Sequence, residues 1–275
     1  MTVNWIELDG LVNLRDLGGT PTTDGAVIAP GRLLRSDNLQ TLTRRDVTAL
    51  LDLGLTDVID LRSDLEVGQE GPGPLTREPS VTIHHHSMFK EALTTAETET
   101  ELTEQLNETR SAEEIKAKAL PWTEIVKPTV EVADDSASFY LSYLVDRPDS
   151  VVAALRAIAG AEGAALVHCA AGKDRTGTIT ALSLLLAGVD RRYVVEDYAR
   201  SAERIDQILA KLAASDTYRD NVLAQPADQQ TTRPETMEMV CDYIATEYGS
   251  VENLLHPMGW TQADTAAIRT KLRAA

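Results

Sequence analysis

One stretch, residues 167–177 (VHCAAGKDRTG), constrains the fold of this 275-residue chain more than any other. The apolar residues 164–167 lead into it and predict a short buried strand. After it, apolar residues recur at helical spacing from Ile179 to Leu186, and Gly188 is a helix stop signal. The sequence therefore predicts a strand, then a tight loop opened by a cysteine, then a helix with an arginine in its first turn.

This geometry makes the loop a candidate phosphate cradle. Its backbone N–H groups can converge on an anion, and the N-terminus of the following helix adds partial positive charge. The same field favours Cys169 as a thiolate nucleophile. Arg175 can bind two phosphate oxygens at once through its planar guanidinium group, which a lysine cannot do.

Other interpretations of the loop fit less well. A nucleotide-binding loop would need a glycine where Val167 stands and a Ser or Thr where Asp174 stands. A redox pair would need a second cysteine where Gly172 stands. A metal site at Cys169 has only His168 nearby, and adjacent strand residues point to opposite faces. A merely structural buried cysteine would leave the arginine, glycine and threonine at fixed offsets unexplained.

His-Cys, five residues, Arg and then Thr resembles the signature of the cysteine-dependent protein tyrosine phosphatase superfamily. The longer form at residues 168–177, HCAAGKDRTG, is similar to the atypical bacterial tyrosine/serine phosphatases that also act on phosphoinositides. Four further segments resemble that family in its order: residues 13–19 (NLRDLGG), 31–36 (GRLLRS), 57–63 (DVIDLRS) and 197–201 (DYARS). The resemblance covers most of the chain and is weakest at about 89–130.

The resemblance implies an α/β fold with a central, mainly parallel sheet of four to five strands flanked by helices. It also implies a helical lid inserted at about 89–130, although a disordered acidic loop remains the alternative. We expect a single phosphatase domain over residues 1–275, because no internal repeat or linker marks a second one. Periodicity predicts strands at 56–61 and 81–84, and helices at 43–53, 139–144, 151–158, 191–212 and 234–247.

Asp149 and Ser150 are expected to cap the helix at 151–158. Asp60 and Arg62 fall at the C-terminal end of the strand at 56–61. Cys169 follows its own strand in the same way, so both sets are expected at one edge of the sheet, where ligands bind in open α/β folds. Mutual pairing of Asp60 with Arg62 is the simpler alternative.

The resemblance implies hydrolysis of phosphomonoesters through a cysteinyl-phosphate intermediate. Cys169 attacks phosphorus, while the loop amides and Arg175 neutralise the charge that grows in the transition state. Thr176 is expected to hydrogen-bond the sulfur and ease its departure. The residues expected to bind the substrate are Ala170, Ala171, Gly172, Lys173 and Thr176. The residues expected to support the site are His168, Asp60, Arg62, Arg15 and Asp16.

A general acid must protonate the leaving oxygen. Typical tyrosine phosphatases carry this aspartate in a Trp-Pro-Asp tripeptide, which is absent here; Pro121-Trp122-Thr123 lacks the acid. Asp174 is therefore the first candidate, as the related family suggests, with Asp60 or Asp16 in reserve.

The choice of substrate depends on Lys173. A cation at the mouth of the site can bind a second phosphate, as phosphoinositides would provide, or simply raise the local potential for phosphotyrosine. We expect phosphotyrosine, phosphoserine, phosphothreonine and phosphoinositides as substrates and inorganic phosphate as product. Two alternatives are a phosphate-recognising module without turnover and a sulfur-transfer enzyme.

The net charge of −17 argues against nucleic acid as a partner and against broad adhesion to anionic membranes. The sequence contains no run of about 18 apolar residues, so it predicts no transmembrane helix. The sequence opens without the pattern of a signal peptide, and a catalytic thiolate suits a reduced compartment, so we expect a cytoplasmic location, with signal-less export left open. Cys241 is expected in the core. We expect no cofactor and no metal, even at His84-His85-His86.

Overall fold

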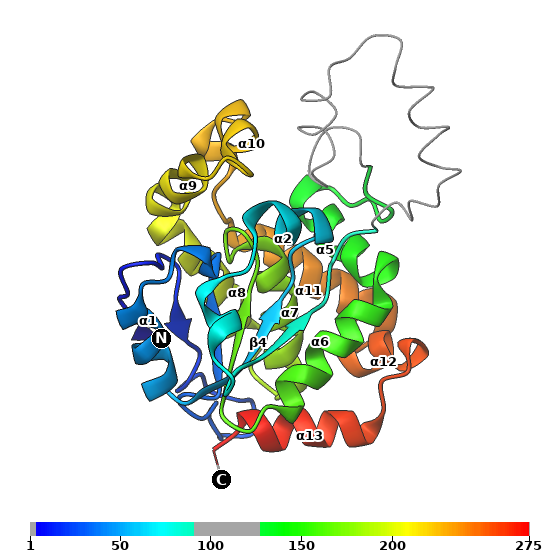
Figure 1. Ribbon diagram of the computed structural model, residues 1–275. Coiled ribbons are helices and arrows are strands. Elements are labelled where there is room, and N and C mark those ends of the chain that lie inside the picture. Colours follow the sequence, from blue (N-terminus) through cyan, green and yellow to red (C-terminus); the bar gives the residue numbers. More distant parts are fainter. Residues whose placement is uncertain (1–3, 91–126, 275) are drawn as a thin grey trace, which may run out of the picture.

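Figure 1 shows the computed structural model, which describes residues 4–90 and 127–274. A six-stranded sheet in the order β1-β2-β3-β6-β4-β5 forms its centre. β3, β6, β4 and β5 run parallel, whereas β1 and β2 extend one edge with antiparallel pairing. The strands are β1 (Asn4–Trp5), β2 (Arg15–Asp16), β3 (Leu33–Ser36), β4 (Leu55–Asp60), β5 (Thr82–His85) and β6 (Ala164–His168).

Helices flank this sheet, and α9 and α10 extend away from it beside the carboxyl ends of the parallel strands (Figure 1). The α-helices are α1 (Arg44–Asp52), α2 (Asp64–Glu70), α5 (Asp135–Asp146), α6 (Pro148–Gly160), α7 (Asp174–Leu186), α8 (Arg191–Ala199), α9 (Ile205–Ala214), α10 (Arg219–Ala224), α11 (Pro234–Tyr248), α12 (Val251–Leu255) and α13 (Gln262–Leu272). The 3₁₀ helices are η1 (Leu39–Thr41), η2 (Pro74–Arg77), η3 (Arg200–Arg204), η4 (Ala227–Gln229) and η5 (His256–Met258).

The side chains of β6 alternate between two hydrophobic cores, because successive strand residues face opposite sides of a sheet. Ala165 and Val167 belong to the larger core, together with residues of α5, α6, α7 and α11. Ala164 and Leu166 belong to the smaller core, together with residues of α1. β6 is therefore buried on both faces, as expected for a central strand of a parallel sheet, and the loop that follows it is anchored firmly.

The α/β class with a mainly parallel sheet is confirmed, and the two short strands β1 and β2 bring the sheet to six strands. The expected common edge is also present, because β4 and β6 pair in a register that places Asp60 opposite His168. The lid expected at about 89–130 falls mostly on residues 91–126, which lie outside the described residues.

Two local expectations are wrong. α6 begins at Pro148 with Arg147 at the N-cap, so Asp149 and Ser150 lie inside the helix; proline is favoured at the first helical position, where its missing N–H costs nothing. The helix expected over 191–212 is divided into α8 and α9 by η3. Ser201, in η3, is fully buried and accepts a hydrogen bond from Asn13, so a tertiary contact accompanies the break.

Candidate active site

β6 ends at His168, one residue before Cys169, and α7 begins at Asp174, so the intervening loop is short. Cys169 is buried, with 1% of its surface exposed. Gly172 has φ +67°, and a Cβ atom there would lie 2.3 Å from the carbonyl oxygen of Ser36. Only glycine combines this backbone conformation with so close an approach. Gly172 thus lets the loop turn tightly against β3.

The carbonyl groups of the loop are held by two side chains behind it. Asn13 Nδ2 donates to the carbonyl oxygens of Ala171 and Gly172 at 3.0 and 3.1 Å. Arg35 Nη2 donates to those of Gly172 and Lys173 at 2.7 and 3.3 Å. In a trans peptide the C=O and the following N–H point in opposite directions. Drawing these carbonyls back therefore turns the next amides outward, as an anion cradle requires.

Asp197 orients the side chains that hold the loop. Its Oδ1 accepts from Arg15 Nε at 2.8 Å and its Oδ2 from Arg35 Nη1 at 2.6 Å. Arg15 also donates to Asn13 Oδ1 at 2.7 Å. Burial favours a higher pKa for Asp197, but the two arginines keep that pKa below its ordinary value. Segments 13–19, 31–36 and 197–201 therefore meet in one buried network.

Arg175 is held by a buried partner, Glu66, that was not among the site residues predicted from the sequence. Its Nη1 and Nη2 donate to the two carboxylate oxygens of Glu66 at 2.5 and 3.0 Å. Its guanidinium carbon lies 4.9 Å from the centre of the Phe89 ring. Burial favours a lower pKa for Arg175, yet the Glu66 charge raises that pKa well above its ordinary value. Such a bidentate pair fixes the plane of the guanidinium group.

Glu66 owes its position to the start of α2. Its carboxylate accepts from the backbone N–H of Ser63 at 2.8 Å, while the Ser63 hydroxyl accepts from the backbone N–H of Glu66. This reciprocal capping box is a readable Ser-x-x-Glu pattern. It could have predicted the helix, but not the contact with Arg175, which lies more than 100 positions away.

Asp60 and Arg62 pair with each other, as the simpler expectation held. Arg62 Nη2 lies 2.6 Å from Asp60 Oδ2, and both side chains are buried. His168 Nε2 lies 3.6 Å from Asp60 Oδ1. Burial lowers the pKa of His168 to about 4, so the ring is neutral at pH 7 and supports the strand end through packing and polar contacts. None of these three side chains lines the cleft described next.

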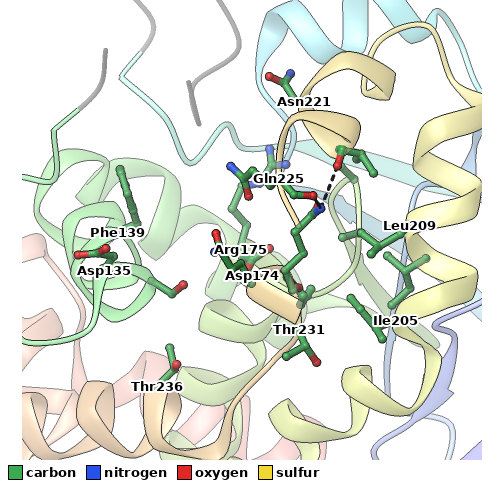
Figure 2. A pocket seen from close by; sticks show the side chains of 18 of the residues that line it. Asp135, Phe139, Asp174, Arg175, Ile205, Leu209, Asn221, Gln225, Thr231 and Thr236 are labelled. Carbon is green, nitrogen blue, oxygen red and sulfur yellow. Dashed lines mark hydrogen bonds and ion pairs between the residues drawn. The ribbon is translucent and has the colours of Figure 1, made fainter. Parts of the chain in front are cut away.

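A cleft of about 860 Å³ opens over the loop, with Cys169, Lys173, Asp174 and Arg175 at its floor. Figure 2 shows Asp174 and Arg175 between Phe139 of α5 on one side and Leu209 of α9 on the other. α5 and α9–α10 therefore form two walls, with the segment 225–233 between them. A phosphate bound to the loop amides would carry its organic group into this cleft.

Of the three acid candidates, only Asp174 lines the cleft. Asp60 is paired as described, and Asp16 accepts from the backbone N–H groups of Gly18 and Gly31. Asp16 therefore supports a turn and has no contact with the loop among the described residues. Asp174 accepts a hydrogen bond from Tyr140.

Two more aspartates, Asp134 and Asp135, line the cleft and were not predicted as site residues. Asp134 caps α5 by accepting from Ala137 N at 2.7 Å. Asp135, the first residue of α5, is exposed and lies on the α5 wall of the cleft (Figure 2). Nothing in the local sequence distinguishes these two from ordinary N-terminal helix residues, which are often acidic.

Two contacts differ from expectation. Thr176 Oγ1 is buried and has no hydrogen-bond partner in the part of the chain that the structure describes, so its expected bond to the Cys169 sulfur is absent. Lys173 Nζ donates to the carbonyl oxygen of Gln230 and lies 3.7 Å from Asp174 Oδ1. The lysine thus reaches across the floor of the cleft to the 225–233 segment.

The described residues offer no group of three or more His, Cys, Asp or Glu side chains placed to hold a metal ion. His84, in the run His84-His85-His86, contacts a carboxylate instead: its Nε2 lies 2.8 Å from Asp57 Oδ1. Cys241 is buried in the core, as expected. Among the helices within 4–90 and 127–274, none has the length and apolar character needed to cross a membrane.

Comparison with known proteins gives a consistent picture. The sequence profile described as the tyrosine phosphatase family matches residues 6–274. A triple specificity protein phosphatase, PtpB, of Mycobacterium tuberculosis is 30% identical over 292 residues, covering 96% of this chain and 97% of the relative. A tyrosine-protein phosphatase of Nostoc commune is 26% identical over 262 residues, covering 92% of this chain and 78% of the relative.

Proposed function

The chain belongs to the tyrosine phosphatase family, and from that premise we propose how its residues divide the work of a phosphatase. Cys169 attacks phosphorus as a thiolate and forms a cysteinyl-phosphate. The loop amides and Arg175 hold the three non-bridging oxygens and stabilise their charge in the transition state. Asp174 protonates the leaving oxygen. A water then releases inorganic phosphate and regenerates the thiolate.

One observation carries this assignment. Cys169, Asp174 and Arg175 share the floor of one cleft, and the carbonyls between them are drawn back by Asn13 and Arg35. The cradle is therefore preorganised for an anion beside a nucleophile and an acid. A binding module would not need the nucleophile, and a sulfur-transfer enzyme would not need the paired arginine. The relatives in Mycobacterium tuberculosis and Nostoc commune are both named as phosphatases.

For the substrate, we propose phosphotyrosine, phosphoserine and phosphothreonine in proteins, together with phosphoinositides. The name of the Mycobacterium relative, a triple specificity protein phosphatase, supports a broad substrate range. A cleft of about 860 Å³ is wide enough for groups of different shape. Lys173, whose stem crosses the floor, can attract a second phosphate where the substrate carries one.

We propose a single domain over residues 1–275, with the interval 89–130 as its lid insertion. We also propose a cytoplasmic location, because a reduced compartment preserves a nucleophilic thiol. Both free cysteines of the described chain are buried.

Phosphate release from a matched substrate panel in the presence of a chelator tests the proposal. The panel contains phosphotyrosine, phosphoserine and phosphothreonine peptides and mono- and bisphosphorylated phosphoinositides. We expect turnover of all classes by the wild type and by Cys241→Ser, and none by Cys169→Ser. Turnover of tyrosine peptides alone would contradict the broad range. Equal turnover by Cys169→Ser would contradict the nucleophile, and transfer of sulfur from thiosulfate would support the other enzyme class.

A further inference from the structure

Tyr140 and Tyr198 form a hydrogen-bonded chain that ends on Asp174. Tyr140, on α5, donates to Oδ1 of Asp174. The hydroxyl of Tyr198, on α8, lies 2.9 Å from that of Tyr140. A hydroxyl has one proton to donate, so the Tyr140 proton goes to the carboxylate and Tyr198 donates to Tyr140. The chain therefore points from the protein interior toward the aspartate.

Aromatic packing fixes the Tyr140 ring. Only 2% of the residue's surface is exposed. The ring meets Tyr198 edge to face, with centroids 6.0 Å apart and planes at 73°, and stacks on Tyr143 with centroids 6.1 Å apart. Burial, together with the Asp174 charge, raises the pKa of Tyr140 well above its ordinary value. The hydroxyl is thus a permanent, rigidly placed donor.

The two carboxylate oxygens of Asp174 have different surroundings. Oδ1 accepts from Tyr140 and lies 3.7 Å from Lys173 Nζ. Oδ2 receives no hydrogen bond from residues 4–90 or 127–274, and 33% of the side chain is exposed. A proton resides preferentially on the oxygen that is not already stabilised as an acceptor. The asymmetry therefore directs the acidic proton to Oδ2.

We propose that Tyr140 is the positioning residue of the general acid: it holds Oδ1 so that the proton sits on Oδ2, facing the leaving group. This inference rests on the proposed function, in which Asp174 is that acid. A sulfur lone pair of Cys169 forms the S–P bond while the P–O bond to the leaving group breaks. The electron pair of that bond stays on the leaving oxygen, which takes the Oδ2 proton.

Asp174 is then a carboxylate, and the bond from Tyr140 becomes charge-assisted and stronger. In the second step Oδ2 accepts a proton from the attacking water, a new P–O bond forms, and the S–P electron pair returns to sulfur as thiolate. Tyr140 donates to Oδ1 throughout, so it orients the acid without exchanging its own proton.

Leaving-group dependence separates positioning from a merely structural role. An acid matters most when the leaving oxygen is a poor leaving group. For Tyr140→Phe, which keeps the ring and its packing, we expect about a tenfold loss of kcat/KM on phenyl phosphate and less than about twofold on p-nitrophenyl phosphate. Tyr243→Phe, on α11 outside the cleft, removes a hydroxyl elsewhere and should change neither.

The variant Asp174→Asn distinguishes a failure of the positioning role of Tyr140 from a failure of the general-acid role of Asp174. Suppose that Asp174→Asn lowers kcat/KM selectively on phenyl phosphate, but Tyr140→Phe lowers it equally on both substrates or on neither. The positioning role of Tyr140 is then wrong, while Asp174 remains the general acid. If Asp174→Asn shows no selectivity, the acid assignment itself is wrong, and Asp135→Asn should be compared. The double variant Tyr140→Phe/Asp174→Asn should lose no more kcat/KM on phenyl phosphate than Asp174→Asn alone. A further loss of about tenfold, selective for phenyl phosphate, would overturn the inference.

Discussion

Glu66 and Arg175 face each other in a fully buried, two-pronged ion pair, with their charged atoms 2.5 and 3.0 Å apart. The pair joins the first turn of α2 to the first turn of α7, the helix that follows the Cys169 loop. Arg175 is therefore fixed before any substrate arrives. Preorganised charge of this kind requires little rearrangement during the reaction.

Replacing Glu66 by Gln removes the charge opposite Arg175 while keeping one hydrogen-bond acceptor. The guanidinium group should lose its fixed plane, and we expect kcat/KM for p-nitrophenyl phosphate to fall by about 10- to 100-fold. Glu70→Gln is the matched control on the same helix, because Glu70 bonds Asn38 and Ser215 rather than Arg175. Equal activities of the two variants would contradict a role for the ion pair.

Replacing Gly172 by Ala should destroy the cradle. The new Cβ would lie 2.3 Å from the Ser36 carbonyl oxygen in a left-handed backbone conformation. We expect activity to fall by at least about 100-fold, since the loop amides must move. Gly188→Ala is the control: its φ is +85°, but no atom lies within 4 Å of the added Cβ. That variant should lose about 1 kcal/mol of stability and keep its kcat, as measured by urea unfolding and steady-state assay.

Asp197→Asn should destabilise the whole protein. It leaves Arg15 and Arg35 buried without the carboxylate that both contact. Breaking a buried ion pair from one side typically costs about 3 kcal/mol or more. Chemical unfolding measures the loss, and Asp242→Asn, whose carboxylate forms an exposed pair with Arg191, is the control. A change below about 1 kcal/mol for Asp197→Asn would show that the network is not needed for stability.

Stability should decrease in mild acid because of His168. Burial lowers the pKa of the folded histidine to about 4, whereas the unfolded residue titrates near about 6.5. Between these values the unfolded chain binds a proton that the folded chain does not, so stability is full above about pH 6.5 and falls toward about pH 4, by up to about 3 kcal/mol.

The free energies of unfolding of wild type and His168→Asn, measured by urea at several pH values, isolate this contribution. The difference between them should narrow as the pH falls from about 6.5 to about 4. A difference that stays constant over this range would mean that the folded histidine titrates normally. Acid-sensitive groups that do not contact His168 affect both proteins alike and cancel.

The part of the site that the sequence predicted is the part built from neighbours in the chain. β6, the loop and α7 follow one another directly, so the positions of Cys169, Asp174 and Arg175 depend on local turn and helix signals. The shared edge of β4 and β6 was also predictable, because parallel strands end on the same side of a sheet. The structure contains the strand–loop–helix arrangement and the shared edge, whereas the catalytic roles of the three residues are a proposal.

The supporting shell was not predictable in the same way. Glu66, Arg35 and Tyr140 reach the site from three separate elements, and their roles depend on tertiary packing. Single-sequence patterns describe a residue's own helix or strand, not its partner a hundred positions away. The resemblance of segments 31–36 and 197–201 pointed to the right regions without saying that they bond each other.

Trapping the cysteinyl-phosphate tests the central claim most directly. Wild-type enzyme is mixed with p-nitrophenyl phosphate, quenched in acid within milliseconds, digested and examined by mass spectrometry. We predict one phosphate on the peptide that contains Cys169, bound to sulfur, and none on the Cys169→Ser protein. Phosphate found on another residue, or undiminished turnover by Cys169→Ser without any phosphoenzyme, would contradict the account.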